Sequence, residues 1–256
     1  MTNKPSPFIW YDLMTPDVKA VKAAEAFYAR VIGWKIADSG MPGMSYSILN
    51  AGDTMVGGMM GAVPGGPPPM WTGYIYSADV DGDTKRAKKL GGKVCKEPDD
   101  IPGVGRFSVI ADPHGAMFNL FKPNSDQSPT KAAEATPGHI GWRELSSGDW
   151  KKAWPFYQKM FGWTKSDAID MGAMGTYQFF KIDGVNAGGM MTRSKDAPPA
   201  SWLYYFNVEA IDDAVARLTG AGGKLCNGPM QVPTGQWIAQ AMDPQGAMFA
   251  MVAGKR

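Results

Sequence analysis

The chain has 256 residues, of which 44% are hydrophobic and 20% are charged, and its formal net charge is +2. This is the composition of an ordinary globular protein, and it gives no electrostatic reason to expect a nucleic acid or an anionic membrane as a partner. Because no apolar run approaches the roughly 20 residues that span a bilayer, and residues 1–7 are polar and proline-rich rather than signal-like, we expect a cytoplasmic protein.

The opening segment predicts a strand followed by a helix. Residues 8–13 are rich in aromatic and aliphatic side chains, as strands are. Thr15-Pro16-Asp17 then predicts a helix start, with Thr15 as the N-cap, the proline at the first helical position and the acid in the first turn. The helix should run over residues 18–32 and end at Gly33. Its helical spacing predicts one buried face, made of Val21, Ala24, Phe27, Tyr28 and Val31.

Three short strands follow, and the same order of elements then repeats to the end of the chain. The remaining strands of the first half are predicted at residues 34–37, 46–49, 54–60, 71–77, 93–96, 106–111 and 116–121, with a helix at 80–90. The second half predicts helices at 149–160 and 211–219 and strands at 140–145, 163–165, 176–181, 185–191, 203–208, 224–226, 236–242 and 247–252. The order strand, helix and three strands therefore occurs four times.

Short motifs recur in the same order in both halves, which indicates an internal duplication. The recurring segments are Phe27-Tyr28 and Phe156-Tyr157, Gly33-Trp34 and Gly162-Trp163, Gly57-Gly58-Met59-Met60 and Gly188-Gly189-Met190-Met191, Gly91-Gly92-Lys93 and Gly222-Gly223-Lys224, and two Asp-Pro-x-Gly-Ala-Met-Phe runs that begin at Asp112 and Asp243. We therefore predict two tandem domains, residues 1–123 and 138–256, joined by a polar linker at residues 124–137.

The two cysteines follow the same duplication. Cys95 and Cys226 occupy equivalent positions, one in each predicted domain, on segments that read as strands. Equivalent positions of separate domains are poorly placed to be bridged. We therefore expect two buried free thiols rather than a disulfide or a metal pair.

A helix ending in Phe-Tyr and Gly-Trp, a Gly-Gly turn and an Asp-Pro-x-Gly turn before the last strand together resemble the vicinal oxygen chelate superfamily. That superfamily includes glyoxalase I, the bleomycin-resistance proteins and the extradiol dioxygenases. The chain is most similar to its two-domain glyoxalase-like proteins, which carry Trp-x-acid-Leu on the first strand, here Trp10-Tyr11-Asp12-Leu13 and Trp142-Arg143-Glu144-Leu145. The resemblance implies an α+β fold in which two strand–helix–three-strand units per domain form a cup-shaped mixed sheet with the helices outside.

The resemblance also implies where a divalent metal would be bound. Metal-dependent members place His or Glu ligands on the inner face of the cup, where several strands converge. The corresponding positions here are Trp10, Thr72 and Asn119 in the first domain, Trp142, Leu203 and Ala250 in the second, and the strands Gly57–Met60 and Gly188–Met191. None carries an imidazole, a carboxylate or a thiolate. We therefore expect neither the family metal nor any other cofactor.

Asp12 and Glu144 are the candidate catalytic residues. Each lies two residues beyond its tryptophan, so the alternation of a strand places it on the same face. A carboxylate in an apolar cup can act as a general base, or it can accept hydrogen bonds that hold the neighbouring strands in place. The second interpretation is favoured, and both remain open.

Aromatic and polar side chains dominate the rest of the predicted inner face. The candidate ligand-binding residues are Trp10, Thr72, Tyr74, Tyr76, Asn119, Trp142 and Tyr205. Such a face suits a small aromatic or apolar molecule. The leading hypothesis is a metal-free, drug-sequestering type of binding protein that is a monomer or homodimer. The alternatives are a glyoxalase-like lyase, isomerase or dioxygenase that uses Asp12 or Glu144 as base, and an interaction module whose cups are filled by side chains.

Overall fold

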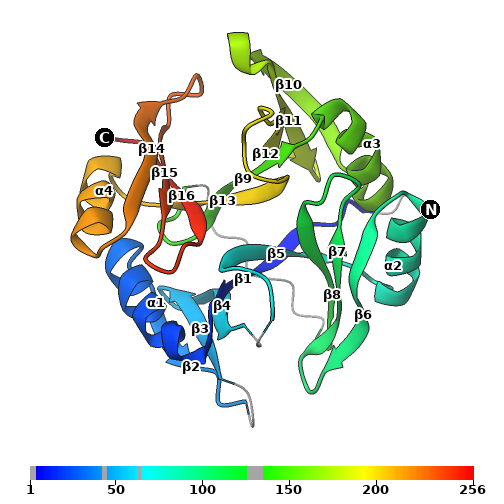
Figure 1. Ribbon diagram of the computed structural model, residues 1–256, viewed down its shortest axis with the longest axis horizontal. Coiled ribbons are helices and arrows are strands. Elements are labelled where there is room, and N and C mark those ends of the chain that lie inside the picture. The colour runs from blue at the N-terminus through cyan, green and yellow to red at the C-terminus, as the bar shows by residue number, and fades with distance from the viewer. Residues whose placement is uncertain (1–3, 42–44, 63–64, 126–134) are drawn as a thin grey trace. The chain divides into compact units, whose positions relative to one another are not determined.

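The computed structural model describes residues 4–41, 45–62, 65–125 and 135–256. They form two eight-stranded sheets with helices packed against them (Figure 1). The α+β class and the duplication of the sheet, both predicted from the sequence, are confirmed. The helices are α1 (Val18–Val31), α2 (Val80–Lys89), α3 (Trp150–Phe161) and α4 (Ile211–Gly220), with a short 3₁₀ turn at Gly172–Met174.

The two sheets have the same strand order. The first contains β1 (Phe8–Thr15), β2 (Lys35–Asp38), β3 (Tyr46–Ala51), β4 (Thr54–Gly61), β5 (Met70–Tyr76), β6 (Lys93–Ile101), β7 (Gly105–Ala111) and β8 (Met117–Pro123) in the order β2-β3-β4-β1-β5-β8-β7-β6. The second contains β9 (Ile140–Ser147), β10 (Thr164–Asp170), β11 (Thr176–Ile182), β12 (Val185–Thr192), β13 (Ser201–Asn207), β14 (Lys224–Gln231), β15 (Trp237–Met242) and β16 (Met248–Ala253) in the order β10-β11-β12-β9-β13-β16-β15-β14.

Every predicted helix and strand is present, and the predicted buried face of α1 is confirmed residue by residue. The helix begins at Val18 as predicted, but its N-cap differs from the prediction. Asp17 is the N-cap, because its extended backbone lets the carboxylate accept a hydrogen bond of 2.9 Å from the amide of Ala20. Thr15 belongs to β1, and its hydroxyl donates to the carbonyl of Asp17 at 2.8 Å.

Strands β6, β10 and β14 each extend five residues past their predicted ends at residues 96, 165 and 226. Each lies at an edge of its sheet and exposes most of its side chains, so the apolar alternation that reveals a strand is weak there. Cys95 and Cys226 lie on β6 and β14, and both are free and exposed. The prediction that these thiols are buried is therefore wrong.

The chain packs into two compact units, and each unit combines parts of both sequence repeats. Unit 1 consists of Met1–Trp10, Gly73–Pro129 and Arg143–Trp202, and unit 2 consists of Tyr11–Thr72, Thr130–Trp142 and Leu203–Arg256. In unit 2 the blue α1 lies against the orange α4, and in unit 1 α2 packs on α3 (Figure 1). Each compact unit therefore depends on side chains from both copies of the duplicated sequence.

A buried tyrosine joins the two repeats within unit 2. The hydroxyl of Tyr28 donates to the Asp243 carboxylate at 3.0 Å and accepts from the indole nitrogen of Trp71 at 2.8 Å. Asp243 also accepts the backbone amides of Gln245 and Ala247, at 2.9 and 2.8 Å. Burial, reinforced by the charge of Asp243, raises the pKa of Tyr28 well above its ordinary value, so the hydroxyl remains a donor.

Unit 1 contains the equivalent arrangement with the repeats exchanged. The hydroxyl of Tyr157 donates to the Asp112 carboxylate at 2.9 Å and accepts from the indole of Trp202 at 3.2 Å. Asp112 accepts the backbone amides of His114 and Ala116, at 2.8 and 2.9 Å. The repeated Phe-Tyr and Asp-Pro-x-Gly motifs are therefore the two sides of one contact, made once in each unit.

Two further contacts follow the same reciprocal pattern. The indoles of Trp34 and Trp163 each donate, at 2.8 Å, to a carbonyl two residues before the first strand of the other repeat, those of Gly138 and Ser6 respectively. Arginines of the second helix of each repeat donate to a carbonyl in the last turn of the other repeat's first helix. These bonds join Arg217 to Val31 at 3.1 and 3.2 Å, and Arg86 to Met160 at 2.7 Å.

We predict that Tyr28→Phe lowers the free energy of unfolding by about 1–3 kcal/mol, because it leaves the buried Asp243 carboxylate and the Trp71 indole each short of one partner. Urea unfolding followed by circular dichroism measures the change. Tyr157→Phe should give a loss of similar size. Tyr76→Phe, at a side chain that is 38% exposed, is the matched control. Equal stability of Tyr28→Phe and the control would contradict the assigned role.

Asp243 should also give the stability a specific pH dependence. Burial raises the pKa of this carboxyl, although the backbone amides of Ala247 and Gln245 and the Tyr28 hydroxyl act in the opposite direction. The folded state then holds the proton to higher pH than the unfolded state. The contribution of Asp243 to the free energy of unfolding is therefore largest below its unfolded pKa and falls as pH rises through its folded pKa.

Asp243→Asn removes this titration. Urea unfolding across the acidic range, from about pH 4 to 7 around the ordinary carboxyl pKa, should show wild-type stability falling relative to the variant as pH rises. The difference between the two proteins isolates Asp243 from the other carboxylates. Parallel stability curves for the two proteins would show that this carboxyl does not titrate as inferred.

Candidate functional site

The repeated Gly-Gly-Met-Met motif makes room for a tyrosine that contacts the first candidate carboxylate. β1 and β4 run parallel, with Asp12 opposite Gly58. Tyr46 of β3 extends over Gly58, where a Cβ atom would collide with the ring. The Tyr46 hydroxyl donates to the Asp12 carboxylate at 2.7 Å, and Asp12 is only 3% exposed. The glycine is required at this position because of the close approach of the tyrosine ring.

The second repeat builds the same arrangement around Glu144. Glu144 of β9 lies opposite Gly189 of β12, and Tyr177 of β11 occupies the space that a side chain on Gly189 would need. The Tyr177 hydroxyl donates to the carboxylate at 2.9 Å. Tyr46 and Tyr177 are not among the site residues predicted from the sequence. The signal that could have found them is their recurrence at equivalent positions of the strand before each Gly-Gly-Met-Met segment.

An apolar cluster occupies the predicted ligand-binding face of the second domain. It consists of the buried Tyr205, Ala250 and Val252, against which Trp142, Leu203 and Ile238 pack. Tyr205 and Ala250 are register partners of β13 and β16. The side-chain amide of Gln240 on β15 donates to the Tyr205 hydroxyl at 2.9 Å. The structure thus brings together Trp142 and Tyr205, two of the predicted ligand-binding residues.

These positions do not fit the metal that the fold family implies. Trp142, Leu203 and Ala250 are the ligand positions of the second domain, and all three belong to the apolar cluster. Trp10, Thr72 and Asn119 occupy those of the first domain, and their indole, hydroxyl and amide are not the thiolate, imidazole and carboxylate groups that bind such ions. Within the described ranges, no group of three or more His, Cys, Asp or Glu residues could hold a metal ion.

The other predicted site residues are distributed over both units. Tyr74 and Asn119 are register partners of β5 and β8 in unit 1, and the Tyr74 ring lies edge-on to Phe121 at 5.7 Å. Asn119 is buried, whereas Tyr76 is 38% exposed. Trp10 and Glu144 also belong to unit 1, and Asp12, Thr72, Trp142 and Tyr205 to unit 2.

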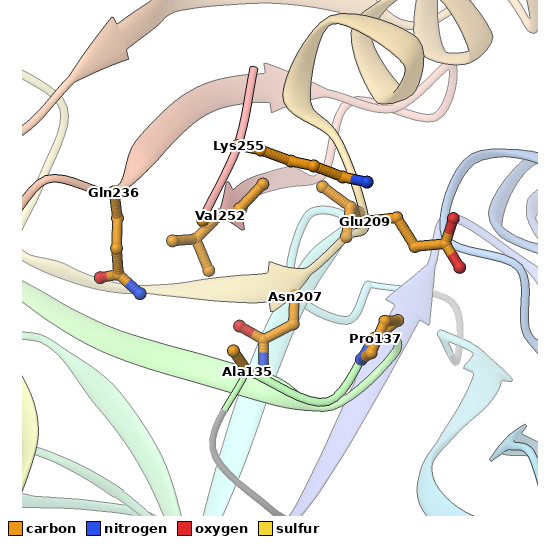
Figure 2. Close-up of a pocket in the computed structure, with 10 residues that line it drawn as sticks. Ala135, Pro137, Asn207, Glu209, Gln236, Val252 and Lys255 are labelled. Carbon is orange, nitrogen blue, oxygen red and sulfur yellow. The ribbon is translucent and has the colours of Figure 1, made fainter.

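A pocket of about 560 Å³ adjoins the apolar cluster in unit 2 (Figure 2). Its lining includes Val252 from the cluster and four polar side chains, those of Asn207, Glu209, Gln236 and Lys255. The volume lies within the range of pockets that hold drug-sized molecules. No helix in the described part of the chain is long and apolar enough to cross a membrane.

Comparisons with known proteins agree with this architecture. The model of the Glyoxalase/Bleomycin resistance protein/Dioxygenase superfamily matches residues 13–120 and 136–251. The Mycobacterium tuberculosis protein named "Putative glyoxylase CFP32" is 32% identical over 248 residues, which cover 95% of this chain and 93% of that protein. The "Anthracycline biosynthesis protein DauV" of a Streptomyces species is 32% identical over 263 residues, covering 95% of this chain and 91% of that protein.

Solved structures share the fold at low sequence identity. The Mn(II)-bound glyoxalase from Novosphingobium aromaticivorans has a TM-score of 0.68 at 18% identity, covering 98% of this chain and 83% of its own. A variant of homoprotocatechuate 2,3-dioxygenase from B. fuscum has a TM-score of 0.67 at 12% identity, covering 99% and 73%. The two family-model matches and the curated relatives together show that the chain belongs to the glyoxalase/bleomycin resistance protein/dioxygenase superfamily.

Proposed function

We propose that this protein binds a small aromatic or apolar molecule on the face formed by the apolar cluster of the second domain, without the metal that other members of its fold use. The observation that carries the proposal is the identity of the residues at the metal-ligand positions. There, Trp142, Leu203 and Ala250 pack with Tyr205 and Val252. Indole, phenol and alkyl groups offer contact area to a flat ligand and no charge to a cation.

The name of one relative, an anthracycline biosynthesis protein, is consistent with a small-molecule ligand. The cluster itself supplies an amphipathic anchor, because the Tyr205 ring is buried among apolar groups while its hydroxyl accepts a hydrogen bond from Gln240. A ring system stacked on the half-buried indole of Trp142, which packs against Tyr205, would gain from apolar burial and from aromatic contact geometry together.

A second candidate function is a glyoxalase-like lyase or isomerase, or a dioxygenase, with Asp12 or Glu144 as general base. It is favoured by the relative named as a glyoxylase and by the burial of Asp12. The tyrosine contacts weigh against it, because a hydrogen bond donated to a carboxylate stabilises the charged form and weakens it as a base. The same contacts suit an acid that holds β3 and β1, or β11 and β9, at a fixed spacing.

Binding of naphthol, a neutral flat aromatic probe, tests the first proposal. Trp142→Ala and Tyr205→Ala should each raise its dissociation constant about tenfold or more, because an aromatic side chain contributes about 1.5–3 kcal/mol of apolar burial. Tyr205→Phe keeps the ring and should bind within about threefold of wild type. Met174→Ala, at a side chain that is 58% exposed and outside the cluster, is the control. Fluorescence titration gives the constants.

Two results would overturn the binding proposal. One is an unchanged dissociation constant for naphthol in both alanine variants. The other is native mass spectrometry that finds stoichiometric Zn, Ni, Fe or Mn in the purified protein, together with a chelator that removes the metal and abolishes ligand binding or turnover. Native mass spectrometry reports the subunit count in the same measurement, and a monomer or a homodimer is expected.

Acid substitutions distinguish the second function from the first. If Glu144 or Asp12 is the base, turnover of methylglyoxal–thiol adducts or catechols should be present in wild type. It should fall at least about 100-fold in Glu144→Gln or Asp12→Asn, the range that general base catalysis contributes. Tyr177→Phe and Tyr46→Phe remove the hydrogen-bond donors and keep the carboxylates, so they should retain turnover. Activity that survives in both acid variants would reject the base assignment.

A further inference from the structure

We propose that the pocket beside the apolar cluster receives an uncharged, hydroxyl-rich substituent of the bound aromatic molecule, such as a sugar. This inference rests on the proposed function, since the aromatic part of the same ligand would lie on the cluster. The substituent would donate hydrogen bonds to Asn207 and Glu209, accept one from Lys255, and bind the Gln236 amide in either sense, all in unit 2. The ligand class is therefore a glycosylated or polyhydroxylated aromatic compound.

The pocket and the cluster adjoin at one residue. Val252 belongs to both, as a buried member of the cluster and as part of the pocket lining. Tyr205 and Asn207 alternate along β13, so both side chains lie on the same face of that strand. A molecule whose rings contact the half-buried Ile238, the register partner of Val252, would lie beside the space of about 560 Å³.

The wall of the pocket is held in place before any ligand arrives. Asn207 binds the segment at residues 135–139 through its amide, which donates to the Thr136 carbonyl at 3.2 Å, and through its main chain. The main-chain bonds join the Asn207 carbonyl to the amide of Gly138 and the Asn207 amide to the carbonyl of His139, both at 2.8 Å. Preorganisation of this kind lowers the entropic cost of binding.

The orientation of the Asn207 carboxamide presents an acceptor to the pocket. Because its nitrogen faces Thr136, its oxygen points the other way, on the side where Gln236 lies (Figure 2). The oxygen lies over Gly141, where a Cβ atom would collide with it. A buried amide oxygen favours a partner that donates a hydrogen bond, and a hydroxyl group is such a partner.

The charges around the pocket balance. Lys255 and Glu209 extend on one side of the pocket and the Gln236 amide lies on the other (Figure 2). One ammonium and one carboxylate give no net charge, so neither an anion nor a cation is favoured as a whole. The four side chains together supply both hydrogen-bond donors and hydrogen-bond acceptors. A ligand hydroxyl group can pair with either, because it both donates and accepts.

The first repeat lacks this set of side chains. The positions equivalent to Asn207, Glu209, Gln236 and Lys255 are Tyr76, Ala78, Gly105 and Asn124. The proposed subsite is therefore specific to the second domain, although the sheets of the two domains share one strand order. If the fold alone produced this set of polar side chains, it would occur in both domains. Its presence in the second domain only is what a specific ligand subsite predicts.

Paired titrations of the full-length protein with naphthol and naphthyl β-glucoside test the inference. Wild type should bind the glucoside at least fivefold more tightly than naphthol. The double variant Gln236→Ala/Lys255→Ala should lose that preference and bind naphthol within twofold of wild type. Lys224→Ala, at an exposed lysine of the same unit outside the pocket, is the control and should retain the preference.

The outcomes separate this inference from the function on which it rests. If naphthol binds at the cluster but the glucoside binds no more tightly, or if the double variant weakens both probes equally, the subsite is rejected while the proposed function stands. If neither probe binds, the proposed function fails and the subsite fails with it. The melting temperature of the double variant is the control for folding. If it equals that of wild type, a lost preference for the glucoside reflects the changed pocket and not a damaged fold.

Discussion

The hydrogen bond from a buried tyrosine to the aspartate of the Asp-Pro-x-Gly turn is the contact on which the compact units depend. Tyr28 reaches Asp243 in unit 2, and Tyr157 reaches Asp112 in unit 1. In each case the tyrosine and the aspartate come from different copies of the repeat. A tryptophan indole completes the hydroxyl's bonding, so the buried polar group is satisfied on both sides. Neither unit can form this network from one copy alone.

The sequence was sufficient to predict the elements and their order. Helical spacing identified the five buried residues of α1, and the glycines and prolines separated strands whose apolar residues alternate. It was insufficient at the sheet edges, where exposed side chains remove the alternation, as at Cys95 and Cys226. The N-cap of α1 was assigned to the wrong residue because threonine and aspartate are both good N-caps, and only the backbone conformation at Asp17 decides between them.

The reciprocal packing could not be predicted for a different reason. Phe27-Tyr28 and Phe156-Tyr157 are equivalent in the two copies of the sequence. Their equivalence does not predict which residues they contact. The partner of Tyr28 is separated from it by most of the chain. At the candidate site, Trp142 stays a predicted ligand-binding residue, and the contact between Tyr46 and Asp12 depends on the absence of a side chain at Gly58. The repeated Gly-Gly motif marks this position in each half of the sequence, but it does not identify the ring that lies over it.

The reciprocal contacts between the two repeats also constrain which residues of such a protein can be substituted. A residue that contacts the other copy, such as Tyr157 or Asp243, can change only if its partner in the other half changes as well. Lys255 and Gln236, which line the pocket, differ from their counterparts in the first half, Asn124 and Gly105. The duplicated chain can therefore keep one copy of a surface unchanged while the other acquires a new specificity, with the shared contacts preserving the fold of both.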